Sequence, residues 1–288
     1  MFNATQLLIR HFANRLRTNY SLVYGRLNPN CADMIAWAGN MALEYIANSD
    51  ALYHNAEHTI LVTLVGQEIL RSKHIREGGV SCEDWLHFTI SLLCHDIGYV
   101  KGVCRQDRPL ERLYATGIEE QMVLLLPEAT DASLAPYHID RAKLFIEDRF
   151  GGDKIIDTQV IGRNIELTRF PMPADEASQD TVNYAGLVRA ADFLGQLSDP
   201  RYLKKISALF YEFAETGINK TLGYQKPEDM WEKYPKFYWD TAYPYIQNAL
   251  TYLEVTQEGK QILANLYGNV FRMNHENKRF LQVMGAAL

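Results

Sequence analysis

Apolar residues along most of this chain recur every three or four positions, which is the period of an α-helix. The N-terminal stretch shows this period in Leu7, Leu8, Phe12 and Leu16. Further helices are predicted over residues 31–49, 58–73, 81–99, 140–150, 155–168 and 186–196, and through most of residues 200–288. Alternation of apolar and polar residues never extends beyond a few positions, so no long strand is predicted. The pattern predicts an all-α fold.

The predicted helix over residues 81–99 is apolar and therefore buried, yet it ends in the dipeptide His95-Asp96. Ser81 and Asp84 have the spacing of a capping box at its start, and Gly98 is a natural end. A buried carboxylate costs free energy unless a hydrogen-bonding partner or a metal ion compensates it. Adjacent helical side chains diverge by about 100°, but both can reach one ion placed between them.

A second pair of polar residues, His54 and His58, lies four positions apart, so on a helix the two would share one face. This spacing occurs in metal sites such as the H-E-x-x-H motif of zinc proteases. A zinc protease needs glutamate directly after the first histidine, whereas this chain has Asn55 there and Glu57 beside the second histidine. The protease interpretation is therefore poor, and the alternative is two histidines on a helix surface.

A carboxylate far downstream, Asp192, lies within an apolar helical face that includes Leu187, Val188 and Leu194. An aspartate in such a face usually has a partner, either a hydrogen-bond donor or a metal ion. The small neighbours Ala190 and Ala191 allow another helix to approach closely. Asp192 is thus a candidate for the same site as the histidines.

Composition and charge restrict the class of protein. The chain has 288 residues, 47% hydrophobic and 22% charged, and we interpret it as a single domain, 1–288, without repeats or a long linker. The net charge of −6 argues against a nucleic-acid polymer as partner, although a local metal can still attract a small phosphorylated ligand. No apolar run reaches the roughly 20 residues of a membrane helix, so no membrane partner is expected.

The four cysteines are scattered without a C-x-x-C pair. In a chain of this length they are expected to be reduced thiols, which predicts a cytoplasmic protein. A homo-oligomer is compatible with the sequence, which does not specify the number of subunits.

The string Y-H-N-A-E-H at 53–58, the later H-D at 95–96 and Asp192 together resemble the HD superfamily of metal-dependent phosphohydrolases, most closely its cyclic-nucleotide phosphodiesterase-like branch. The resemblance covers about residues 53–200, which would form the metal-binding core of a phosphodiesterase-like helical bundle. It implies that His58, His95, Asp96 and Asp192 bind the metal and that His54 protonates the leaving oxygen.

Imidazole and carboxylate ligands suit a divalent transition metal such as Zn, Mn, Fe or Ni. Asp96 has two oxygens and can bridge to a second ion, such as Mg. His138 matches the second member of a histidine pair in the family, but Tyr137 replaces the first, and Ala135 replaces a glutamate. These departures put a complete second metal site in doubt. His138 and Asn55 are expected to support the ligands or contact the substrate.

The resemblance implies an enzyme, a phosphodiesterase or phosphomonoesterase, that hydrolyses a small phosphate ester such as a nucleotide or cyclic nucleotide. A metal ion lowers the pKa of bound water towards about 7 and so supplies hydroxide for the attack. Two alternatives stay open: a non-catalytic sensor that binds metal and nucleotide, and an HD-type di-iron oxygenase. The aromatic-rich last third, about residues 200–288, either lines a pocket or packs as core.

Overall fold

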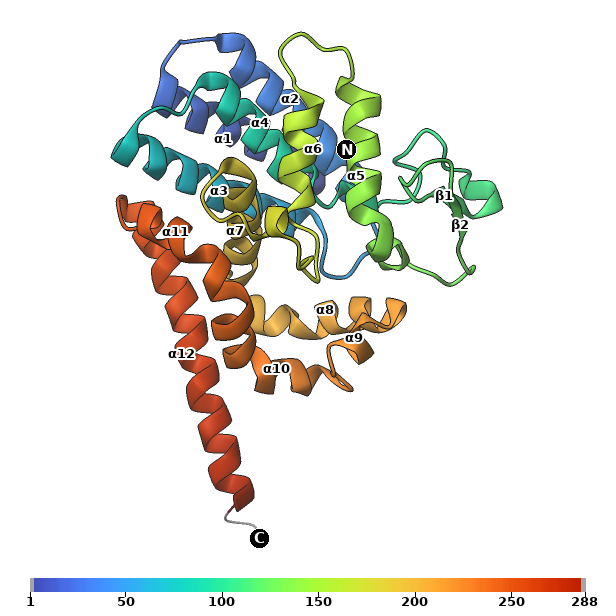
Figure 1. Cartoon of the computed structure of the whole chain (residues 1–288), viewed down its shortest axis with the longest axis vertical. Helices are drawn as coiled ribbons and strands as arrows, with labels where there is room; N and C mark the ends of the chain where they lie inside the picture. The colour runs from blue at the N-terminus through green and yellow to red at the C-terminus, as the bar shows by residue number, and fades with distance from the viewer. Residues whose placement is uncertain (1–2, 286–288) are drawn as a thin grey trace.

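The computed structural model describes residues 3–285, with side chains to residue 275. It is all-α, as the sequence predicts, and within the described residues the strands form only one short hairpin (Figure 1). The helices are α1 Ala4–Tyr24, α2 Pro29–Ile46, α3 Ala56–Glu77, α4 Cys82–Cys94, α5 His138–Phe150, α6 Thr158–Glu166, α7 Tyr184–Leu197, α8 Tyr202–Thr216, α9 Ile218–Thr221, α10 Pro227–Lys236, α11 Tyr243–Leu253 and α12 Gln257–Gly285. None of them, within the described range, is both long and apolar enough to cross a membrane.

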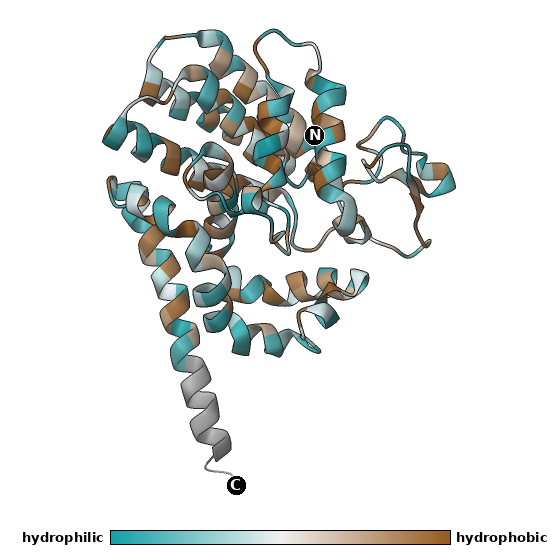
Figure 2. Cartoon of the chain, viewed as in Figure 1, coloured by the Kyte–Doolittle hydropathy of each residue, from teal (hydrophilic) through white to brown (hydrophobic). Residues whose placement is uncertain are grey.

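The N-terminal helices form a packed layer. Helix α2 packs on both α1 and α4, and α3 lies between α4 and α7. Helices α8, α9 and α10 form a lower layer, beside which α12 runs down and projects from the body (Figure 1). One hydrophobic cluster extends from Ile9 in α1 to Met273 in α12. Figure 2 shows apolar and polar positions alternating within the long helices, as amphipathic helices require.

The start of α4 is as predicted, but its end is not. Ser81 Oγ accepts a hydrogen bond from the Asp84 backbone at 3.0 Å, and Asp84 Oδ2 accepts one from the Ser81 backbone at 2.9 Å, which completes the capping box. The helix ends at Cys94, and residues 97–99 form a separate 3₁₀ turn, η1 (Ile97–Tyr99). The ring of His95 competes for the carbonyl oxygen of Leu92, which a continuing helix would offer to the next turn.

The buried face of α1 also differs from the prediction. Its buried residues include Ile9, Phe12, Leu16 and Tyr20, whereas Leu7 and Leu8 are about half exposed. The helical period is as predicted, but the buried face of α1 does not include Leu7 and Leu8. The reason is that the partner surface on α2 determines which side of an amphipathic helix is covered.

A hairpin projects from the body between α4 and α5 (Figure 1). Strand β1 (Leu113–Ala115) pairs antiparallel with β2 (Met122–Leu124), and the 3₁₀ turn η2 (Pro109–Glu111) precedes it. The sequence predicts no long strand, and strands of only three residues give no readable alternation.

The buried guanidinium of Arg141 fastens this segment to α5. Its N–H groups donate to the carbonyl oxygens of Gly98, Val100 and Ala115 and, at 2.9 and 3.0 Å, to both carboxylate oxygens of Asp107. All five donors of the side chain are thereby used. The arginine therefore holds together the chain on both sides of the hairpin and the segment that follows Asp96.

Asp107→Ala is expected to lower the free energy of unfolding by about 3–5 kcal/mol, because it leaves the charge of Arg141 buried without its carboxylate. Asp33→Ala breaks the exposed ion pair with Arg17 and should cost no more than about 1 kcal/mol. Urea unfolding followed by circular dichroism measures both. Similar losses in the two variants would contradict a structural function for the buried pair.

Candidate metal centre

The two histidines of the H-N-x-x-H motif lie on either side of the start of α3. Asn55 Oδ1 accepts hydrogen bonds from the backbone N–H groups of Glu57 and His58, at 3.0 and 3.4 Å, and so caps the helix. The helix begins at Ala56, and His54 lies in the turn before it. The expectation that His54 and His58 share a helix face is therefore wrong. Asn55 supports His58 through the backbone.

His95 and Asp96 follow the last residue of α4 and are almost fully buried. Nδ1 of His95 donates a hydrogen bond to the carbonyl oxygen of Leu92 at 2.8 Å. This bond orients the ring, so that Nε2 faces Asp96 Oδ2 at 3.1 Å. A histidine oriented by a backbone carbonyl in this way presents Nε2 to a metal ion.

Asp192 reaches the same place from α7, which packs along α3. The two helices approach closely because small residues lie between them. A Cβ atom added to Gly195 would lie 2.7 Å from the Cα atom of Val62, and one added to Gly66 would lie 3.1 Å from the Cβ atom of Ala191. This close approach brings the carboxylate of Asp192 within reach of the histidine on α3.

Four ligand atoms converge at this point. Nε2 of His58 lies 3.3 Å from Asp96 Oδ2 and 3.3 Å from Asp192 Oδ1, and Nε2 of His95 lies 3.1 and 3.5 Å from the same oxygens. Ligand atoms around a zinc-like ion, bound at about 2.0–2.1 Å, are separated by roughly 3.0–3.5 Å. Nε2 of His58, Nε2 of His95 and Oδ2 of Asp96 are buried without a hydrogen-bond partner. Such atoms are costly unless something binds them, and a transition-metal ion fits this donor set.

The charges of the cluster favour a cation. Burial raises the pKa of Asp96, but the charges of His95 and His54 outweigh burial and hold that pKa well below its usual range. Burial likewise raises the pKa of Asp192, and the interactions with the nearby rings of His58 and His95 lower it below the ordinary value. Both carboxylates therefore stay ionised and stabilise positive charge between them.

Glu212, on α8, is the functional residue that the sequence did not reveal. Its Oε2 lies 2.5 Å from Nδ1 of His54, and its Oε1 accepts the backbone N–H groups of Tyr53 and His54 at 2.5 and 3.2 Å. Burial lowers the pKa of His54, but Glu212 and Asp96 outweigh burial and raise it to about 9. The imidazolium form of His54 is thus held beside the candidate metal ligands. The signal that the sequence offered for Glu212 was a glutamate among apolar and aromatic residues of a predicted helix.

The ring of His54 also belongs to an aromatic stack. It lies parallel to the ring of Tyr99, with centroids 4.5 Å apart, and Tyr99 stacks on His138 at the same distance. Nδ1 of His138 donates to the carbonyl oxygen of Ala135 at 2.6 Å, and burial lowers the pKa of His138 to about 4. Gly98 makes this packing possible, since a Cβ atom there would lie 1.9 Å from the carbonyl oxygen of His138.

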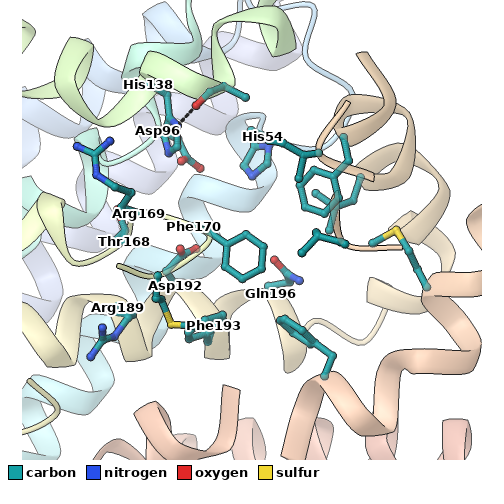
Figure 3. Close-up of a pocket in the computed structure, with 18 of the residues that line it drawn as sticks. His54, Asp96, His138, Thr168, Arg169, Phe170, Arg189, Asp192, Phe193 and Gln196 are labelled. Atoms are coloured by element: carbon teal, nitrogen blue, oxygen red, sulfur yellow. Dashed lines mark hydrogen bonds between the residues drawn. The ribbon is translucent and has the colours of Figure 1, made fainter. Parts of the chain in front are cut away.

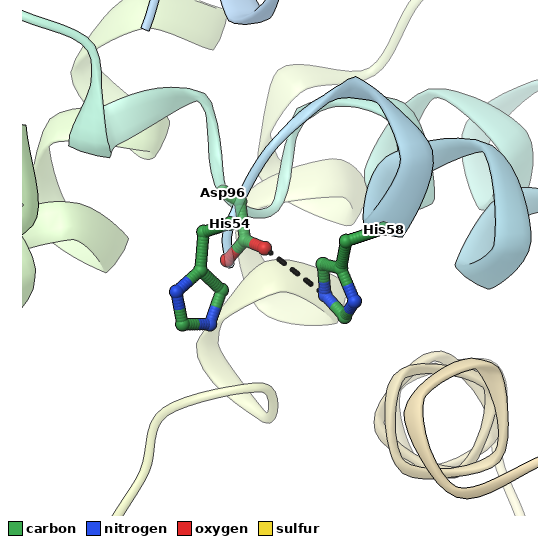
Figure 4. Close-up of side chains that lie close together, drawn as sticks. All are labelled: His54, His58 and Asp96. Carbon is green, nitrogen blue, oxygen red and sulfur yellow. Dashed lines mark ion pairs between the residues drawn. The ribbon is translucent and has the colours of Figure 1, made fainter. Parts of the chain in front are cut away.

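Among the described residues, two groups can hold a metal ion: His58 with His95 and Asp192, and His54 with His58 and Asp96. Figure 4 shows the second group, with Asp96 between the two histidines and its ion pair to His58 dashed. His138 lies beside the site but belongs to neither group. Because Nε2 of His58, Nε2 of His95 and Oδ2 of Asp96 are the buried atoms without a hydrogen-bond partner, the first group and Asp96 form the better centre.

A cavity with about 1010 Å³ of empty space, part of it open to solvent, adjoins the cluster. His54, Asp96, His138 and Asp192 line one end of it, and the carboxylates of Asp96 and Asp192 point toward one another there (Figure 3). The candidate metal centre therefore lies at one end of a partly open cavity.

The chain belongs to the Npun_R2479-like family, which matches residues 2–276. No curated protein matches the chain.

Proposed function

We propose that this protein is a metal-dependent phosphohydrolase that acts on a small phosphate ester. The observation that carries the proposal is the convergence of His58, His95, Asp96 and Asp192, with three of their ligand atoms buried and without a hydrogen bond. The resemblance of these residues to the HD superfamily supports the reaction class. The proposal includes a cytoplasmic location, in keeping with four cysteines that are free and buried.

The ligands would hold a divalent ion such as Zn, Mn, Fe or Ni, which supplies Lewis acidity and an activated water molecule when it is bound. The other parts of the reaction belong to the chain itself. Glu212 keeps His54 protonated and turned toward the cavity, where the imidazolium can donate a proton to the leaving oxygen. Tyr99 supports that ring from one face.

A screen of metals and substrates tests the proposal. The purified chain is depleted of metal, reloaded with Zn, Mn, Fe, Ni or Mg, and assayed for phosphate release or ester cleavage over nucleotides, cyclic nucleotides and simple phosphate esters. We expect turnover with at least one transition metal and its loss in Asp96→Asn. Metal and nucleotide binding without turnover would favour the sensor, and bound iron with oxygen uptake would favour the oxygenase.

A further inference from the structure

The cavity beside the metal centre has two unlike ends. The charged and imidazole groups come from the turn before α3, the turn after α4, the start of α5, the chain after α6, and α7. The other end, which we call the α8–α10 chamber, is lined by Phe213, Ile218, Leu222, Tyr224, Met230 and Phe237. Most of these side chains are half-buried, so they keep apolar surface that a ligand can cover. Among residues 202–275, whose side chains are described, every one that lines the cavity is uncharged.

Several charged side chains of the same helices are engaged elsewhere. Lys205 pairs with Asp199 at 2.6 Å, Glu215 accepts the Thr130 backbone N–H at 2.6 Å, and Lys233 donates to the carbonyl oxygen of a turn glycine at 2.7 Å. Glu212 does not line the cavity, because its carboxylate binds His54 and the backbone. The described side chains that line the α8–α10 chamber therefore offer no counter-ion to a ligand.

The two arginines in the cavity wall do not change this conclusion. Arg169 donates to Glu166 at 2.6 Å and to Asp140 at 3.0 Å. Arg189 donates to the carbonyl oxygens of Ser178, at 2.5 Å, and Asp180, and its guanidinium lies 4.1 Å from the ring centroid of Tyr245. Figure 3 shows both guanidinium groups turned away from the middle of the cavity. A nucleoside polyphosphate in the middle of the cavity would thus find neither guanidinium group turned toward its additional phosphates.

The polar groups next to the chamber pair with each other. Gln196 donates its amide to the hydroxyl oxygen of Tyr202 at 2.7 Å. Both residues line the cavity between its two ends, and both are neutral. They can accept or donate a single hydrogen bond to an uncharged ligand, whereas a buried charge at this position would stay uncompensated and costly.

We propose that the substrate is a phosphate ester of a bulky, uncharged and largely apolar alcohol, whose alkyl or aryl group fills the α8–α10 chamber while its phosphate lies at the metal centre. This inference rests on the proposed phosphohydrolase function and narrows its substrate class. Covering half-exposed apolar walls is favourable in proportion to the area removed from water. The same walls exclude leaving groups that carry charge.

Binding of n-alkylphosphonates tests the inference without turnover, because their carbon–phosphorus bond is not the bond that a phosphate esterase cleaves. Calorimetry on the metal-loaded full chain would compare the methyl to octyl members. We expect the affinity to rise about three- to fourfold per methylene until the chamber is full, with a negative heat-capacity change. A phosphonate of equal length that ends in a carboxylate should lose most of this gain.

Two leucine variants test whether the dependence of affinity on chain length arises in the α8–α10 chamber. Leu222→Gln should flatten the dependence on chain length and leave methylphosphonate binding unchanged, whereas Leu124→Gln, on exposed β2, should behave like the native chain. An affinity independent of chain length in the native protein, or equal binding of the carboxylated probe, would overturn the inference. A normal dependence on chain length in a protein that hydrolyses no phosphate ester would uphold the chamber and reject only the proposed reaction.

Discussion

Asp192→Asn is expected to lose stoichiometric metal binding. The substitution keeps the size of the side chain but replaces an anionic ligand with a neutral one, while His58, His95 and Asp96 stay in place. Metal that binds only the folded state stabilises it by about 4 kcal/mol at a thousandfold excess over Kd. Elemental analysis should therefore show metal in the native chain and little in the variant. A chelator should lower the melting temperature of the native chain only.

The matched control is Glu57→Gln, which removes a carboxylate next to His58. Glu57 turns away from the centre and pairs with Arg201 and, at 3.0 Å, with Lys205. This variant should keep the native metal content and the native response to a chelator. If Asp192→Asn kept its full metal content, the ligand set would be wrong. If both variants lost the metal, the loss would report general damage around α3.

Much of the ligand set could be predicted from the sequence because each ligand carried a local signal. His95 and Asp96 ended an apolar helix, and Asp192 interrupted the apolar face of another. A polar group in a buried position requires a partner, so these residues can be recognised as site candidates before any contact is known. The structure confirms the all-α fold and places these residues beside His58, at distances that suit a shared ion.

The local backbone around the ligands was less predictable, because side chains decide where the helices begin and end. The apolar period predicts a helix from residue 58, yet the amide of Asn55 takes the first backbone N–H groups and starts the helix at Ala56, just after His54. The ring of His95 similarly takes a carbonyl oxygen and ends α4 early. A hydrophobic pattern contains no information on this competition between a side chain and the helix for one hydrogen bond.

Glu212 could not be found because its partner is 158 residues away in the chain. Its neighbours on α8 are apolar and aromatic, which the sequence shows, but the pattern does not indicate which distant histidine the carboxylate contacts. The same limit applies to the stacking of Tyr99 between two histidines. Pairing across the fold depends on how helices pack, whereas burial depends mainly on the residue and its period.

His54→Ala is expected to keep its metal and its fold but to lose about 10²- to 10⁴-fold in turnover on esters with an alkoxide leaving group. The reason is that His54 is the cationic acid held by Glu212, and its ring does not belong to the four-ligand cluster. A nitrophenyl ester should suffer much less, since nitrophenolate leaves without a proton. His11→Ala, at an exposed histidine, should behave like the native protein with both substrates.

The variant Glu212→Gln distinguishes proton donation by His54 from a purely packing function of its ring. A general acid acts in its protonated form, so turnover on the alkyl ester is full below the pKa of His54 and is lost as the pH rises through it. Glu212 raises that pKa, to about 9 in the native chain, and its removal should shift the alkaline fall in turnover to lower pH. Equal losses on the alkyl and nitrophenyl esters in His54→Ala, with the metal retained, would contradict the acid role. Loss of the metal in that variant would instead make His54 a ligand.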